Sequence, residues 1–244
     1  MCLKRSIFSL LLLLMLNGPA LASGQVNVEI EKTRIIFNAN KNQTYWSLEN
    51  KASETYFFIA SVHETNARLD LGKKTTGFIV SPPSGLIRPN ERTVFRIVKT
   101  NDTLSNDVES LALLQVKLLS AVHKPEVTKS HHFQNLVKLF IKLFHRPVDL
   151  IDDRAVVKQL NTLTATCWEG NLKIKNPSNY WLTVDAVMIG KQNILNHLDK
   201  KPLLAPLGHW NKLINKCPTN VNIKLLDETG LPTHLKSIDV EGVR

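Results

Sequence analysis

Polar and apolar positions alternate with a period of two over many short segments of this chain, which is the pattern of half-buried β-strands. Each segment is rich in β-branched and aromatic residues and is bounded by Asn, Gly, Pro or Ser. Seven or eight such strands before Pro147 predict a sandwich of immunoglobulin size. The predicted strands of this first domain are residues 26–30, 33–37, 43–48, 55–62, 77–80, 92–98, 111–119 and 133–145.

A second series of strand-like segments follows residues 148–153, which we interpret as a linker. Its turns are marked by Gly170 and by the Asn-Pro-Ser-Asn sequence at 176–179. We therefore expect an all-β chain with a first domain over residues 23–147 and a second over 154–244. The predicted strands of the second domain are residues 163–166, 171–175, 180–188, 211–214, 219–226 and 233–240.

The first 22 residues have the three parts of a secretory signal peptide. Lys4 and Arg5 precede an apolar run of about ten residues, which is half the length needed to span a bilayer. Ala20 and Ala22 are the small residues that a signal peptidase reads, so we predict cleavage after Ala22. The alternative is a buried N-terminal helix. No later segment combines such apolarity with sufficient length, so we expect no membrane insertion of the mature chain.

The cysteines are consistent with export to an oxidising compartment. Cys2 leaves with the signal peptide, and Cys167 and Cys217 remain, fifty positions apart. An even pair in a secreted protein predicts a disulfide, which would contribute about 4 kcal/mol in the chain-entropy model. The alternative is two buried thiols.

The net charge of +10 suits an acidic partner, and a hydrophobic content of 43% excludes a disordered chain.

The longest predicted strand, residues 133–145, is the most informative part of the sequence. A basic amphipathic helix is the rival interpretation, because Lys138 and Lys142 are four positions apart, and it would suggest binding to a membrane surface. The all-β surroundings and Pro147 favour a strand. At about thirteen residues, the predicted strand is longer than most strands. A strand that extends beyond its own sheet leaves backbone hydrogen-bonding groups for a partner.

Signatures of catalysis and cofactor binding are absent from the sequence. It contains no Gly-rich phosphate loop, no Gly-x-Ser-x-Gly elbow and no His-Glu-x-x-His. His123, His131 and His132 lie in a polar segment without acidic or cysteine companions at ligand spacing. We therefore expect no enzyme activity, no catalytic residue, no cofactor, no metal site and no nucleic-acid partner.

Five motifs, in order and spread over residues 25–240, resemble those of the periplasmic chaperones of the chaperone–usher pilus pathway. The resemblance implies two immunoglobulin-like β-sandwich domains in a boomerang arrangement. It also implies a periplasmic chaperone that completes pilin subunits by lending them a strand, as such chaperones do, and delivers them to an outer-membrane usher. The motifs are residues 33–37, 76–83 with 86–90, 141–147, 175–184 and 226–232.

The resemblance assigns roles to individual residues. Arg34 and Lys142 would anchor the pilin's C-terminal carboxylate through charge-assisted hydrogen bonds. Glu109, Arg146 and Asp227 would form ion pairs between the domains. The donor strand would present Phe133, Asn135, Val137 and Leu139, of which Asn135 departs from the apolar pattern of the family.

Two features refine this interpretation. The cysteine pair lies in the second domain, and the segment 120–132 is of modest length, which favours the short-loop branch of the family. The long open edge also allows a self-capping oligomer of the free protein. The alternative function is a secreted two-domain adhesion or binding module that recognises an acidic partner, such as a polysaccharide, through its basic surface.

Overall fold

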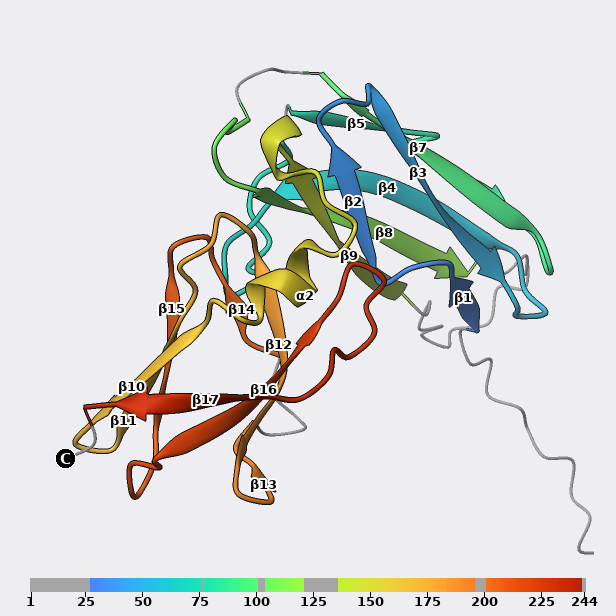
Figure 1. The fold of residues 1–244 in the computed structure, drawn as a ribbon. Coiled ribbons are helices and arrows are strands. Elements are labelled where there is room, and N and C mark those ends of the chain that lie inside the picture. The colour runs from blue at the N-terminus through green and yellow to red at the C-terminus, as the bar shows by residue number, and fades with distance from the viewer. Residues whose placement is uncertain (1–26, 76, 101–103, 121–135, 196–200, 243–244) are drawn as a thin grey trace, which may run out of the picture.

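The computed structural model describes residues 27–75, 77–100, 104–120, 136–195 and 201–242. The predicted signal peptide and the donor residues Phe133 and Asn135 therefore lie outside the described part of the chain. The described residues form two β-sandwiches set at an angle to each other (Figure 1). The all-β prediction is confirmed.

The first sandwich consists of two sheets, with strand orders β1-β3-β7-β5 and β2-β9-β8-β4-β6. The strands of the first sheet are β1 (Val28–Ile30), β3 (Gln43–Asn50), β7 (Arg92–Lys99) and β5 (Phe78–Ser81). Those of the second are β2 (Arg34–Asn38), β9 (Leu136–Arg146), β8 (Ser110–Ser120), β4 (Tyr56–Glu64) and β6 (Ser84–Ile87).

The core of the first sandwich follows from the alternation of side chains along each strand. In β4, Tyr56 and Phe58 point inward and are buried, whereas Phe57 and Ile59 face outward. Aromatic rings from both sheets fill the interior, and the ring centroids of Phe58 and Phe95 are 5.2 Å apart. This packed interior fixes the positions of β2 and β9, which carry the candidate site.

The second sandwich forms one continuous strand path, β13-β12-β16-β17-β10-β11-β15, and β14 pairs with β12. Cys167 in β10 and Cys217 form a disulfide with a Cα–Cα distance of 5.7 Å, which confirms the predicted pairing. The strands are β10 (Thr164–Trp168), β11 (Asn171–Lys175), β12 (Leu182–Ile189), β13 (Gln192–Asn193), β14 (Leu203–Leu204), β15 (His209–Leu213), β16 (Asn220–Leu226) and β17 (Lys236–Glu241).

Two short helical elements, which the alternation pattern did not predict, connect the sandwiches. The 3₁₀ turn η2 (Val148–Leu150) begins within the predicted linker, and helix α2 (Ala155–Gln159) follows it. Ala155 and Val156 of α2 are buried against the second core. None of the helices in the described residues has the length and apolarity needed to cross a membrane.

Candidate functional site: an open strand edge beside two cations

The predicted long strand exists as β9, and half of it has a free edge. β2 runs parallel to β9 and pairs with it from Arg34 opposite Lys142 to Asn38 opposite Arg146. The preceding residues of β9, Leu136–Ile141, pair only with β8 within the part of the chain that the structure describes. The backbone groups of this stretch that point away from β8 are therefore open to another strand.

The side chains on this free stretch are incompletely covered. Val137 and Leu139 are half-buried against the core of the first sandwich. Leu136 and Phe140 point to the opposite face and are 47% and 45% exposed. An apolar partner that covered both faces would remove this surface from water, which is favourable at roughly 25 cal/mol per Å².

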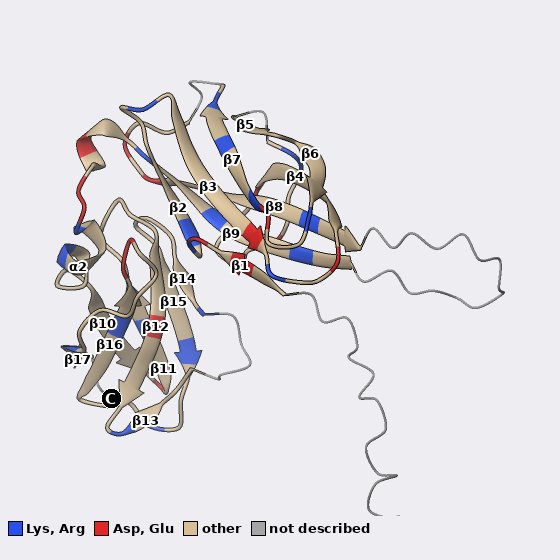
Figure 2. Ribbon diagram, turned by 90° about the vertical axis from the view of Figure 1, so that its right-hand side faces the viewer, with Lys and Arg blue, Asp and Glu red and all other residues tan. Residues whose placement is uncertain are grey.

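The free edge ends at two basic side chains from neighbouring strands, Arg34 of β2 and Lys142 of β9 (Figure 2 shows basic positions on both strands). Their Cα atoms are partners in the ladder, so the side chains lie on the same face of the sheet. Neither cation forms an ion pair with an acidic side chain of the described residues. Two adjacent cations that are not engaged in ion pairs form a site for an anion.

The guanidinium of Arg34 is held in place by the second sandwich. Its Nη1 donates to the main-chain oxygens of Leu226, at 3.0 Å, and Asp227, at 2.7 Å. The residue is only 4% exposed, and its buried Nε has no hydrogen-bond partner. Burial lowers the pKa of Arg34, and the nearby Asp227 opposes this. Because Nε is buried and Nη1 binds these carbonyls, Nη2 is the part of the guanidinium that is left to donate to a carboxylate.

Lys142 is the second half of the anion site. Its Nζ contacts Thr183 Oγ1 of β12 at 3.5 Å. Burial, together with the positive charges of Arg34 and Lys201, lowers the pKa of Lys142 to about 8. A carboxylate placed between Arg34 and Lys142 would relieve this repulsion, so the site favours an anionic ligand.

The interdomain charges differ from the prediction by one residue. Arg146 Nε donates to Glu109 Oε1 at 2.9 Å, and both side chains are almost completely buried. The second carboxylate that reaches Arg146 belongs to Glu228, at 3.5 Å, so the assignment of Asp227 to this ion pair was wrong. Asp227 begins a turn, and its Oδ1 accepts hydrogen bonds from the backbone N–H groups of Thr229 and Leu231. The next side chain along the chain therefore points to Arg146.

Glu109 ties the two sandwiches together through both of its oxygens. Its Oε2 accepts a hydrogen bond from the Trp181 backbone N–H at 2.9 Å. Burial raises the pKa of Glu109, whereas the charge of Arg146 and the Trp181 N–H lower it. The Arg146 ion pair and the Trp181 hydrogen bond offset part of this burial, and through them Glu109 connects the two domains in one relative placement.

Sequence analysis missed two residues of this region, Thr183 and Glu228. Thr183 lies within the motif at 175–184, but a threonine in a strand carries no signal of a polar contact with another domain. Glu228 lies beside the assigned Asp227, and the direction of a side chain in a turn cannot be read from spacing alone.

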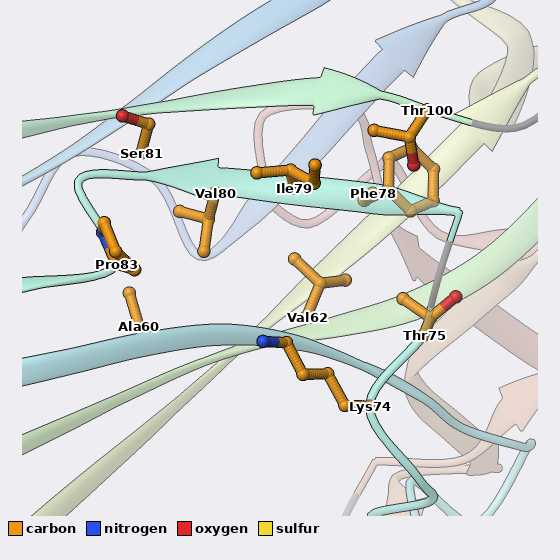
Figure 3. A pocket seen from close by; sticks show the side chains of 10 residues that line it. All are labelled: Ala60, Val62, Lys74, Thr75, Phe78, Ile79, Val80, Ser81, Pro83 and Thr100. Atoms are coloured by element: carbon orange, nitrogen blue, oxygen red, sulfur yellow. The ribbon is translucent and has the colours of Figure 1, made fainter.

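Surface hollows lie beside β2 and beside β4. One has a volume of about 490 Å³, and Arg34, Tyr45, Glu228 and Leu231 are among its lining residues. Another, of about 480 Å³, opens between β4 and β5 (Figure 3). Val62, Phe78 and Val80 point into that second hollow. None of the predicted site residues is among the residues that line it.

Comparison with known proteins defines the class to which this architecture belongs. Residues 27–150 match the family of pili and flagellar-assembly chaperones, PapD N-terminal domain, and the chain belongs to this family. The predicted family resemblance is therefore confirmed.

Individual relatives agree with this assignment. The chain is 32% identical over 158 residues to the chaperone protein LpfB of Salmonella typhimurium, which covers 64% of this chain and 65% of LpfB. The fold is similar to that of the Escherichia coli chaperone DraB, with a TM-score of 0.75, 19% identity and coverage of 88% of this chain and 97% of DraB. It also resembles the Salmonella enterica structure of the SafA pilin in complex with the SafB chaperone, with a TM-score of 0.73, 18% identity and coverage of 89% and 98%.

Proposed function

We propose that this protein is a periplasmic chaperone that binds, folds and caps pilin or fimbrial subunits by donor-strand complementation and delivers them to an outer-membrane usher. The observation that carries the proposal is the position at which β2 begins. Because β2 occupies the edge of β9 only from Lys142 onward, a client strand can take the same track along Leu136–Ile141. The added strand would meet the start of β2 and end there.

This geometry sets the direction of the client strand. A strand whose carboxyl end stops at Arg34 and Lys142 runs parallel to β9, as β2 does. Its terminal carboxylate then lies between Nη2 of Arg34 and the ammonium of Lys142. Main-chain pairing along β9 supplies affinity that is independent of sequence, and the two cations fix the register.

The donor side chains are Phe133, Asn135, Val137 and Leu139. Of these, Val137 and Leu139 lie on the inward face of the free stretch and are only half-buried, so a client core can cover what the first sandwich leaves open. The interdomain contacts made by Glu109 and Arg146 keep the cations at the end of this track.

The proposed location follows from the N-terminal pattern. A cationic start, a short apolar run and Ala20-Leu21-Ala22 supply a cleavable secretory signal, and the mature chain begins after Ala22. The Cys167–Cys217 disulfide fits an oxidising periplasm. The division into domains at residues 147 and 154 fits the two separate cores.

A direct test uses a synthetic twelve-residue peptide of alternating Val and Thr, prepared with a free or an amidated carboxyl end. We expect the free acid to bind at least about tenfold more tightly, since hydrogen bonds to charged groups contribute about 1.5–3 kcal/mol each. Arg34→Ala and Lys142→Ala should each abolish this difference. Lys138→Ala, an exposed change on the same face of β9, is the matched control and should keep it.

The same experiment separates the chaperone from an adhesion module. A surface that binds an acidic polymer should lose affinity to a similar degree for Lys138→Ala and Lys142→Ala, and it should weaken steeply with salt. Equal binding of the acid and the amide by the folded wild type would contradict the proposed carboxylate anchor.

A further inference from the structure

The second sandwich brings another cation close to the carboxylate anchor. Strand β12 carries Thr183, which contacts Lys142, and Asp185, which forms an ion pair with Lys201. The backbone that follows Lys201 is fixed to β12, because Val184 N donates to Pro202 O at 2.9 Å. Lys201 is therefore held beside the strand that faces the anchor.

The two ammonium groups are near neighbours. They contact the side chains of Thr183 and Asp185, which are two residues apart on β12 in a segment with a β-bulge. The Cα atoms of these two residues are therefore at most about 7 Å apart, which is within the Debye length of about 8 Å in physiological salt. The influence of Lys201 on the pKa of Lys142 agrees with this placement. Among the described residues, Asp185 is the acidic partner of Lys201, and its side chain is 16% exposed against 49% for Lys201.

A terminal carboxylate engages Arg34 and Lys142 and leaves Lys201 available. The added strand has to stop before Arg34, so its last residue can lie opposite Phe140, which shares a face of β9 with Lys142. The side chain of that last residue is then directed to the face on which the Lys142 ammonium lies, which is the face turned toward β12. A lysine ammonium has three donors, so Lys201 can keep its bond to Asp185 and donate to a second carboxylate.

We propose that Lys201 is a further specificity-determining residue, which selects clients whose C-terminal residue is Asp or Glu. The inference rests on the proposed function, because it needs the terminal carboxylate at Arg34 and Lys142. The terminal carboxylate binds the pair of cations from the first sandwich, and the acidic side chain binds the cation from the second.

The test compares two synthetic twelve-residue Val-Thr peptides with free carboxyl ends, one ending in Asp and the other in Asn, by fluorescence anisotropy at low salt. The wild type should prefer the Asp peptide by about five- to tenfold. Lys201→Met should reduce this ratio to about one while leaving the affinity for the Asn peptide within about twofold. Lys201→Arg, which keeps the charge, should retain the preference. Lys191→Met, an exposed lysine of the same sandwich, should not alter it.

The outcomes distinguish this inference from the function on which it rests. If the wild type binds the two peptides equally, or if Lys201→Met keeps the same preference as Lys191→Met, and Lys142→Ala still weakens both, Lys201 has no role in selection. If Lys142→Ala weakens neither peptide, the carboxylate anchor itself fails. Thermal unfolding of each variant confirms that the loss of preference is measured on folded protein.

Discussion

Replacement of Lys142 by methionine should stabilise the free protein and remove its binding site for the client carboxylate. Burial and the neighbouring cations lower the pKa of Lys142 from 10.5 to about 8. At about 1.4 kcal/mol per pKa unit, this shift corresponds to about 3 kcal/mol that the charged side chain costs the folded state at neutral pH. Methionine retains the long apolar stem without the charge, so we expect a gain of about 2–3 kcal/mol in the free energy of unfolding.

The dependence on pH gives this prediction a sign. The pKa of Lys142 is lower in the folded than in the unfolded state, so the unfolded wild type binds more protons between pH 8 and pH 10.5. Wild-type stability relative to Lys142→Met should therefore rise across this window. The advantage of the variant should be complete below pH 8 and should vanish above pH 10.5.

Urea unfolding at neutral and alkaline pH measures this difference, with Lys138→Met as the matched control. Lys138 is exposed on the same face of β9, so its replacement should change stability by less than about 0.5 kcal/mol. A Lys142→Met protein no more stable than Lys138→Met at pH 7, or a gain that persists at pH 11, would refute the reasoning. The Lys142→Met variant should also bind the free-acid and amidated peptides equally. Lys142 would then be a residue that is required for binding but reduces the stability of the free protein.

Two further predictions concern the contacts that hold the structure together. Glu109→Ala leaves the buried Arg146 without its close partner and should cost about 3–5 kcal/mol, seen as a lower thermal unfolding midpoint; an unchanged midpoint would show that the ion pair does not stabilise the domain placement. The double change Cys167→Ser and Cys217→Ser should lower the free energy of unfolding of the second sandwich by up to about 4 kcal/mol. A reduced wild type that is as stable as the oxidised wild type would contradict this.

The regular strands could be read from the sequence because their cores are built from alternating residues. The predicted strand at 92–98 corresponds to β7 at Arg92–Lys99, and that at 111–119 corresponds to β8 at Ser110–Ser120. The short strands β13 and β14 and helix α2 were missed. Two-residue strands are too short to show a period, and the helix is defined by packing on the second core rather than by its own pattern.

The candidate site could be predicted only in part for a related reason. Arg34 and Lys142 could be named because they lie in motifs that resemble those of the chaperone family, and the structure does place them side by side. The contacts of Arg34 with the main-chain oxygens of Leu226 and Asp227 have no such signal, since a carbonyl oxygen belongs to every residue. The same applies to Glu228, whose direction is set by the turn that begins at Asp227.

The attachment of Arg34 to a loop of the other sandwich makes the placement of the domains part of the binding equilibrium. Gly230 of that loop, with φ of +90°, approaches Thr33 so closely that an added Cβ would lie 2.6 Å from its hydroxyl oxygen. The first sandwich on its own would keep the free edge of β9 but lose the carbonyls that orient the guanidinium. By thermodynamic linkage, binding of a client must stabilise the contact between the two sandwiches by the same free energy with which that contact strengthens client binding.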